Sequence, residues 1–261
     1  MTDKPVYTWT ASNGVATITL DNPPRNAYPA RATAELMTCL DEIEADQSVR
    51  AVVITSAGDK FFSVGADVSE FPEVMKPGRG HELAVTTQNL LLRLEAFPKP
   101  TICAINGLAL GFGCLIAIAC DMRIAAENAQ IGLPEVKLAV FPGGGGTLRL
   151  PRLVGEAKAK EMLLFGDAVN AQDAYRIGLM NRLVPVGQAA STAQELAAQL
   201  AGYSAVVVQA IKETVHAARE LTLKEGVALE IETLDRVSKC EDAKEGMQAF
   251  LEKRKPQFRH R

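Results

Sequence analysis

Residues 104 to 115 read Ala104-Ile-Asn-Gly-Leu-Ala-Leu-Gly-Phe-Gly-Cys-Leu115, and they join two elements of different type. The continuous apolar run 101–105 is typical of a strand buried on both faces. Residues 111–120 predict an apolar helix entered through glycine. The first N–H groups of a helix lack internal partners and lie at the positive end of its dipole. An amide here can therefore receive developing negative charge, although a close helix–strand contact would also explain the glycines.

Strands and helices alternate on both sides of this segment. The expected strands are 51–55, 101–105 and 122–125, and helical spacing is found at 36–43 and 83–94. Such alternation predicts parallel strands with right-handed crossovers and helices packed outside. At the start of the chain, Asn13-Gly14 between 7–10 and 15–20 predicts an antiparallel hairpin.

The last third of the chain has a different character. Residues 156–258 show helical spacing, with one convincing strand at 182–185. No low-complexity linker separates the parts. We therefore expect an α/β protein with one continuous domain, in which 1–195 form the core and 196–261 a helical C-terminal region.

Composition limits the class of protein. Apolar residues make up 48% of the 261 residues and charged residues 23%, as in soluble globular proteins. The formal net charge of −3 offers no broad attraction for nucleic acid or anionic membranes. The five cysteines form no CxxC pair, residues 1–10 lack a leader pattern, and no apolar run approaches the ~20 residues of a membrane span. We expect a cytoplasmic protein.

Two motifs could carry chemistry. Glu135 follows Pro134 in an apolar stretch, where a carboxyl group tends to have a raised pKa and can carry protons near neutral pH. On these residues alone, the better explanation is a glutamate in the first turn of a helix, where it complements the dipole. Gly65, after the strand that ends near Ile54, either permits a tight turn alone or brings backbone to a ligand.

Other motifs are set aside. Gly143–Gly146 lack the Lys-Ser/Thr that follows a nucleotide phosphate loop. Cys114 has no histidine near it in sequence and is interpreted as an inert buried thiol. His81 lies in a polar loop and is expected to be exposed, and no cluster has metal-ligand spacing.

Six stretches in this order resemble the crotonase (enoyl-CoA hydratase/isomerase) superfamily over nearly the whole chain. They are 21–27, 62–67, 104–114, 129–138, 142–150 and 250–258. The resemblance implies a spiral of ββα units followed by a helical trimerisation region. It also implies an acyl-CoA substrate, with no cofactor apart from the coenzyme A of the substrate, and a homo-oligomer that is a trimer or a dimer of trimers.

The resemblance also implies residue roles. The backbone N–H groups of Ala66 and Phe112 would form an oxyanion hole around the thioester carbonyl, with Glu135 as the catalytic carboxylate. Pantetheine would lie along backbone near Ala27 and Gly65. The remaining expected substrate-binding residues are Arg25, Val64, Asp67, Val68, Leu115 and Gly143. Phe112 stands where most members have glycine, so its ring is expected to narrow or redirect the acyl pocket.

Leu115 departs from the hydratases of the family, which carry a second glutamate at this position. One carboxylate suffices to move a proton from C2 to C4 of a 3-enoyl-CoA, so the sequence predicts an isomerase similar to single-glutamate enoyl-CoA isomerases. Hydration assisted by Tyr28 or His81, another reaction on the same oxyanion platform, and a non-catalytic CoA- or RNA-binding homologue are the alternatives.

Binding of the CoA phosphates has no clear motif. Ser69 stands where a lysine is common in the family. Arg25, Lys253, Arg254 and Lys255 are candidates, and the last three could equally be a solvated basic tail.

Overall fold

Two β-sheets form the body of the computed structural model, which describes residues 4–261. The first three residues of the expected core lie outside the described residues. The larger sheet has the order β1-β2-β3-β5-β7-β10. Its strands are β1 (Tyr7–Ser12), β2 (Val15–Leu20), β3 (Ala51–Ser56), β5 (Thr101–Ile105), β7 (Met122–Ala126) and β10 (Arg182–Val184).

The larger sheet confirms the predicted hairpin and parallel core. β1 and β2 pair antiparallel from Tyr7↔Leu20 to Ser12↔Val15, around a turn in which Asn13 has φ 51° and Gly14 φ 77°. β2, β3, β5, β7 and β10 are then parallel neighbours. All six residues of β3 are buried, as a strand covered on both faces requires.

The smaller sheet carries the segments that lead to the site. Its order is β4-β6-β8-β9, with β4 (Phe61–Ser63), β6 (Leu108–Leu110), β8 (Gln130–Gly132) and β9 (Val169–Asn170). β4, β6 and β8 are parallel, and β9 is antiparallel to β8. The expectation of a single strand after residue 156 was wrong, because two residues are too few to show a strand period.

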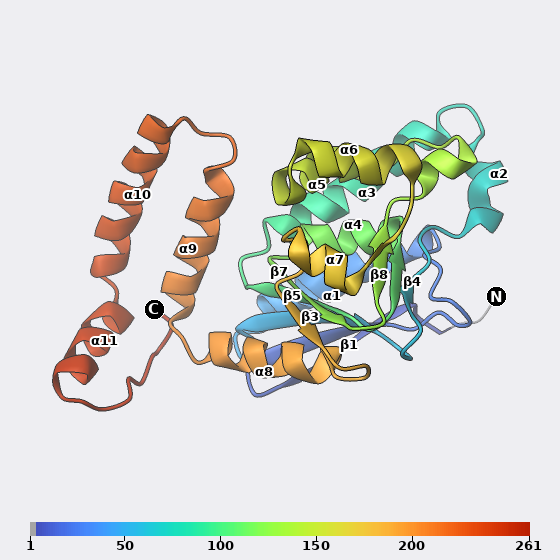
Figure 1. Ribbon diagram of the computed structural model, residues 1–261. Coiled ribbons are helices and arrows are strands. Elements are labelled where there is room, and N and C mark those ends of the chain that lie inside the picture. Colours follow the sequence, from blue (N-terminus) through green and yellow to red (C-terminus); the bar gives the residue numbers. More distant parts are fainter. Residues whose placement is uncertain (1–3) are drawn as a thin grey trace.

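Helices cover both faces of the larger sheet (Figure 1). The body contains α1 (Arg31–Ala45), η1 (Val68–Glu70), α2 (Phe71–Val74), α3 (Arg79–Glu95), α4 (Phe112–Ala119), η2 (Glu135–Leu138), α5 (Gly146–Val154), α6 (Glu156–Phe165), α7 (Ala171–Arg176) and α8 (Ala189–Ala201). One apolar core includes Ile54, Phe62 and Leu91, and a second joins the opposite sheet face to the alanines of α8. The predicted boundary at 195/196 falls within α8.

Three further helices, α9 (Ala205–Ala217), α10 (Leu223–Ser238) and α11 (Glu241–Leu251), project from the body (Figure 1). We call residues 205–251 the C-terminal arm. None of the α10 residues is buried, although a capping box of Thr222 and Glu225 begins the helix. The arm is therefore well formed locally but buries little apolar surface within one chain.

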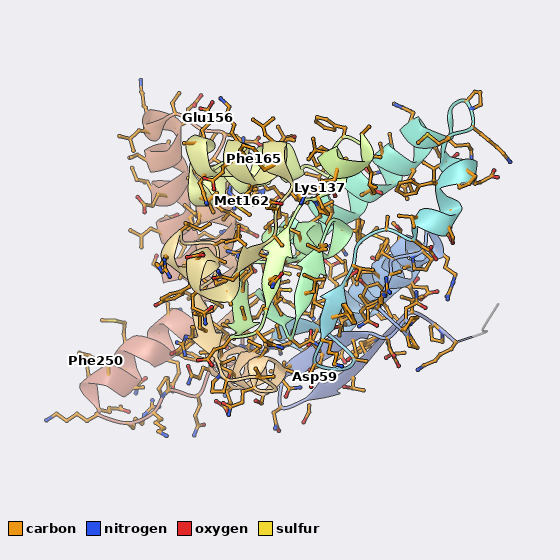
Figure 2. The ribbon with its side chains drawn as sticks, turned by 45° about the vertical axis from the view of Figure 1, so that its right-hand side comes forward. Asp59, Lys137, Glu156, Met162, Phe165 and Phe250 are labelled. Carbon is orange, nitrogen blue, oxygen red and sulfur yellow. The ribbon has the colours of Figure 1, made fainter. Side chains whose placement is uncertain are left out.

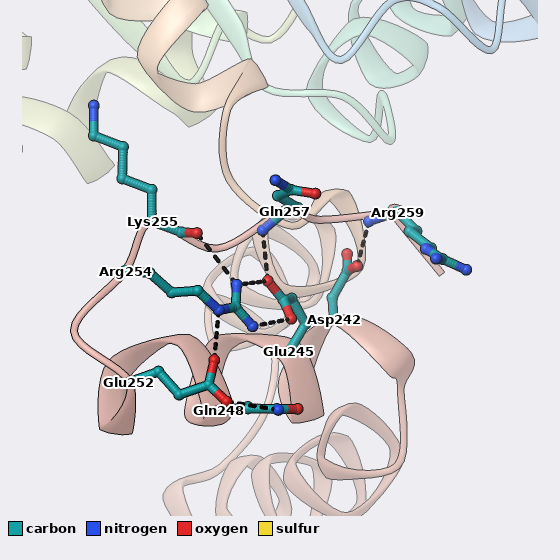
Figure 3. A network of polar contacts seen from close by, with 8 residues as sticks. All are labelled: Asp242, Glu245, Gln248, Glu252, Arg254, Lys255, Gln257 and Arg259. Carbon is teal, nitrogen blue, oxygen red and sulfur yellow. Dashed lines mark hydrogen bonds and ion pairs between the residues drawn. The ribbon is translucent and has the colours of Figure 1, made fainter.

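The last residues fold back onto α11 (Figure 3). Arg254 forms a two-point ion pair with Glu245, at 2.5 and 2.9 Å, and lowers the pKa of that carboxyl to about 2. The buried carboxylate of Asp242 accepts hydrogen bonds from the backbone N–H groups of Arg259 and His260. These contacts fix the tail against the end of the arm.

Two expectations from composition can be compared with the structure. All five cysteines are free thiols, and four of them are buried. Within residues 4–261, no helix combines the length and apolar character needed to cross a membrane.

Candidate active site

The turn at Gly111, between β6 and α4, is the point where three segments meet. Gly111 has φ 51° and ψ −119°, a conformation that favours glycine. A Cβ built on it would lie 3.1 Å from Oε1 of Glu135 and 3.4 Å from Cα of Gly65. The sequence therefore places glycine where the backbone of the loop after β4 and the carboxylate of η2 both come close.

The backbone N–H groups of Ala66 and Phe112 make this turn a candidate anion site. A Cβ on Gly65 would lie 3.5 Å from the nitrogen of Phe112, so the two loops are in contact. Neighbouring groups are paired: Tyr28 N–H donates to Gly65 O and Asp67 N–H to Tyr28 O. Within residues 4–261, neither Ala66 N–H nor Phe112 N–H donates a hydrogen bond to another group of the protein. Two unpaired donors on adjacent loops make a candidate oxyanion hole.

Glu135 is the acid beside these amides. It is the first residue of η2, after Pro134. Glu135 is therefore both a first-turn residue of a short helix and a candidate proton carrier. Its Oε2 is buried without a hydrogen-bond partner within residues 4–261, and burial raises the pKa of the carboxyl. An acid in this state is suited to exchanging protons with a ligand.

The position of η2 is fixed by α6. A Cβ on Gly166, just after α6, would lie 2.9 Å from Cγ1 of Val136 and 3.4 Å from Cε of Lys137. Figure 2 shows Lys137 beside the α6 residues Met162 and Phe165. Packing against a helix of the body thus orients the segment that carries the carboxylate.

Leu115 lines an apolar wall next to the amides. It is 5% exposed and belongs to the first turn of α4. A Cβ on Gly144 would lie 2.6 Å from Cδ1 of Leu115 and 3.0 Å from Cδ1 of Leu91, and one on Gly146 would lie 2.8 Å from Cδ1 of Leu133. The position that carries a second glutamate in the hydratases of the family is occupied here by hydrocarbon.

The ring of Phe112 is accommodated inside the body. It stacks on Tyr28 with 3.7 Å between ring centroids and is 7% exposed. The Tyr28 hydroxyl donates to Oγ1 of Thr33. The ring therefore leaves the amide of Phe112 in place, and its effect on the acyl pocket stays a prediction.

The structure brings part of the predicted substrate-binding set together. Ala27 lies beside this site because buried Asn26 donates to the carbonyls of Ala57 and Phe61, and Ser63 Oγ donates to Asn26 O. Sequence analysis missed Asn26, whose positive φ of 53° is not visible in a motif. The Asp67 carboxylate is occupied locally, where it accepts from Ser69 N and Oγ.

The other predicted substrate-binding residues lie around the edges. Val64 is half-buried, whereas Arg25, Val68 and Gly143 are exposed. Of the basic candidates for the CoA phosphates, Arg254 is paired with Glu245 and Glu252. Lys253 and Lys255 are exposed in the tail.

The residues set aside behave as ordinary structure. Cys114 is buried, and burial raises the pKa of its thiol. His81 is exposed at the start of α3. No group of three or more potential metal-binding side chains occurs among residues 4–261.

The fold and the site together define a class of protein: a body of ββα units in which two adjacent amide donors lie beside the half-buried carboxylate of Glu135. The sequence profile of the family described as enoyl-CoA hydratase/isomerase matches residues 10–261. A probable enoyl-CoA hydratase of Bacillus subtilis is 42% identical over 94% of this chain and 95% of its own length. The 2,3-dehydroadipyl-CoA hydratase of Escherichia coli is 38% identical over 95% and 96%.

Solved structures agree. The enoyl-CoA hydratase of Bacillus anthracis matches with a TM-score of 0.94 and 35% identity, over 98% of this chain and 100% of that chain. Pseudomonas aeruginosa DspI matches with a TM-score of 0.94 and 37% identity, over 99% and 98%. The chain belongs to the enoyl-CoA hydratase/isomerase family and has the crotonase fold.

Proposed function

We propose that this enzyme moves a double bond in an acyl-CoA, converting a 3-enoyl-CoA into a 2-enoyl-CoA. The observation that carries the proposal is the pairing of a half-buried carboxylate at Glu135, whose Oε2 is buried without a hydrogen-bond partner within residues 4–261, with hydrocarbon at Leu115. A proton shift needs one carboxylate, whereas hydration also needs a water molecule that is bound and activated. The amides of Ala66 and Phe112 complete the site as the oxyanion hole.

The chemistry proceeds through a dienolate. Glu135 removes a proton from C2, and the negative charge develops on the thioester oxygen. The N–H groups of Ala66 and Phe112 donate to that oxygen, and one such donor contributes about 2.7–4 kcal/mol in other enzymes. Protonated Glu135 then returns the proton to C4, which leaves the double bond between C2 and C3.

The raised pKa of Glu135 suits both halves of this cycle. Its cause is loss of solvation, so the carboxylate form is a stronger base than an exposed glutamate. A general base and acid of matched pKa contributes about 10² to 10⁴ in rate. The side chains of Leu115, Leu91 and Leu133 gather around the glycine loop, and this apolar wall favours return of the same proton.

Hydration of a 2-enoyl-CoA is the second candidate, because the relatives described above are named hydratases. A residue other than Leu115 would then have to hold the water. The Tyr28 hydroxyl is buried and bonded to Thr33, and His81 is exposed at the start of α3. Neither arrangement supports that role, so we place isomerisation first.

The C-terminal arm supports the proposal that the enzyme works as a trimer or a dimer of trimers. Apolar side chains of α10 at helical spacing are strongly exposed, with Leu223 at 86%, Ile231 at 64% and Leu234 at 69%. A stripe of this kind is ordinarily covered in the functional assembly. We further propose a cytoplasmic enzyme whose CoA is part of the substrate.

The direct test is Glu135→Gln, assayed on 3-hexenoyl-CoA. The amide keeps the size of the side chain but cannot take up a proton, so we expect turnover to fall by about 10² to 10⁴ with little change in CoA-thioester binding. Glu73→Gln, an exposed glutamate of α2, is the matched control and is expected to behave as wild type. Unchanged turnover of Glu135→Gln would remove the proposed base.

A further inference from the structure

We propose that Arg149 and Glu95 are positioning residues for the loop Gly143–Gly146, and that Arg219 of the C-terminal arm completes their support. The loop backbone contacts Leu115 through Gly144 and Gly146. Its shape therefore decides how the apolar wall beside the candidate site is packed. This inference rests on the proposed function only in taking that wall as part of the active site.

The guanidinium of Arg149 is built into the loop. Its Nη1 donates to the carbonyl of Gly144 at 2.9 Å in a buried hydrogen bond. A Cβ on Gly145, whose φ is 76°, would lie 2.1 Å from the same nitrogen. Glycine at this position thus makes room for the arginine side chain. The loop cannot keep its present path unless the guanidinium keeps its place.

Glu95 fixes the other side of that guanidinium. Its Oε2 accepts from Nε of Arg149 at 3.0 Å and lies 2.9 Å from Nη2, so the pair is two-pointed. The side chains are only 7% and 12% exposed, which means that neither charge can be solvated if its partner is lost. Arg149 is held by its carboxylate partner while it binds the loop carbonyl.

The arm reaches this pair through its own arginine. Arg219, between α9 and α10, forms an ion pair with Oε1 of Glu95. The two oxygens of one carboxylate therefore bind two guanidinium groups, one from α5 and one from the arm. Displacement of the arm would remove the ion pair of Arg219 with Glu95. Glu95 would then be held less firmly in the position in which it binds Arg149.

The test compares full-length Arg149→Lys with wild type by amide hydrogen exchange without substrate. Lysine keeps the charge but not the planar fork that serves Glu95 and Gly144 together. We expect exchange in 143–146 to rise about tenfold, with the buried strand β5 unchanged. On the preferred acyl-CoA, kcat is expected to fall by about 10-fold to 10²-fold, with KM within about twofold.

Three further variants make the result decisive. Arg236→Lys changes an arginine that pairs with Glu213 inside the arm and should match wild type. Arg219→Lys should raise loop exchange to a smaller extent than Arg149→Lys, and an unchanged loop would overturn the role of the arm. Glu95→Gln should also raise amide hydrogen exchange in residues 143–146. It replaces Arg149→Lys as the test if that variant does not fold. Wild-type exchange in both Arg149→Lys and Glu95→Gln would overturn the proposal.

The exchange readout separates this inference from the proposed function. A loosened loop in an enzyme that hydrates crotonyl-CoA would sustain the positioning role and remove the isomerase assignment. Unchanged loop exchange in the variants of an enzyme that isomerises efficiently would remove the positioning role and keep the isomerase assignment.

Discussion

The body and the C-terminal arm of this chain use apolar side chains in opposite ways. In the body, β3, β5 and α4 are buried along their whole length. In the arm, α10 buries no residue and α9 buries one, Ala210. The amides of Ala66 and Phe112 and the carboxylate of Glu135 all come from the body. Arg219 of the arm reaches the glycine loop only through Glu95 and Arg149. The difference indicates that the chemistry is assembled within one fold, whereas the arm presents a surface for assembly.

This comparison separates two kinds of sequence change. Changes near Gly111 act on atoms that would touch the substrate or the carboxylate. Changes on the exposed stripe of the arm act on association. The predictions below test that separation, from the largest expected effect on the reaction to the smallest.

The largest effect is expected for Gly111→Ala. The new Cβ would lie 3.1 Å from Oε1 of Glu135, in a backbone conformation that alanine rarely adopts. A small displacement of reacting groups can cost about 10² in rate, so we expect at least that loss. The same substitution in the arm, Gly226→Ala, meets no atom within 4 Å and should leave the rate unchanged. Equal losses of rate in Gly111→Ala and Gly226→Ala would contradict the assignment of catalysis to the body and of association to the arm.

A change of reaction is expected for Leu115→Glu. The new carboxylate would supply the group that the hydratases of the family have at this position. We expect isomerisation to fall about tenfold as the site becomes wet and as like charges compete for protons. Hydration of crotonyl-CoA should appear, and Leu115→Gln, with similar size but no titratable group, should not gain it. Product analysis of the three proteins decides the point, and a wild type that already hydrates faster than Leu115→Glu would contradict the role of Leu115.

The pH dependence should report the burial of Glu135. Burial raises the pKa of Glu135 above 4.5. As the pH is lowered, the base is protonated, and kcat/KM should therefore begin to fall at a higher pH than it would with an exposed glutamate as the base. For stability the sign is opposite to that of a paired carboxylate. The contribution of Glu135 is complete below its unfolded pKa and is lost as the pH rises through its folded pKa. An acid limb at or below 4.5 in the kcat/KM profile would show that the carboxyl is solvated.

The smallest effect on the chemistry is expected for Ile231→Glu in the arm. Ile231 is 64% exposed in one chain, so the free energy of unfolding of that chain should change by less than about 0.5 kcal/mol. The charge would nevertheless enter the proposed interface, and sedimentation should show loss of the oligomer. Glu232→Lys, an exposed charge change in the same helix but on a different side from the stripe, is the control. An unaltered mass for Ile231→Glu would show that this stripe is not the contact.

Much of the body could be predicted from sequence because its signals are local. Thr101–Ile105 is continuously apolar, and Asn13-Gly14 is a strong turn pair, so strand and hairpin were both correct. The ordered motifs identified the family before any contact was known. β9 was missed because its two residues pair with β8 through tertiary contact alone.

Several features of the site could not be predicted, because they depend on distant residues. The contact of Glu135 with Gly111 joins residues 24 positions apart in the chain, and nothing in either motif gives their distance. Arg149 lies in a quoted motif, but its partner Glu95 ends a helix 54 residues earlier. The stacking of Phe112 on Tyr28 likewise follows from the packing of two loops that the sequence presents separately.

The most direct measurement is a parallel assay of the purified enzyme on 3-hexenoyl-CoA and on crotonyl-CoA, with the 2-enoyl and hydrated products followed separately. One carboxylate beside an apolar wall predicts efficient formation of 2-hexenoyl-CoA and little hydration of crotonyl-CoA. Efficient hydration with slow isomerisation would contradict the single-carboxylate account and assign water activation to a group outside the pair Leu115 and Glu135.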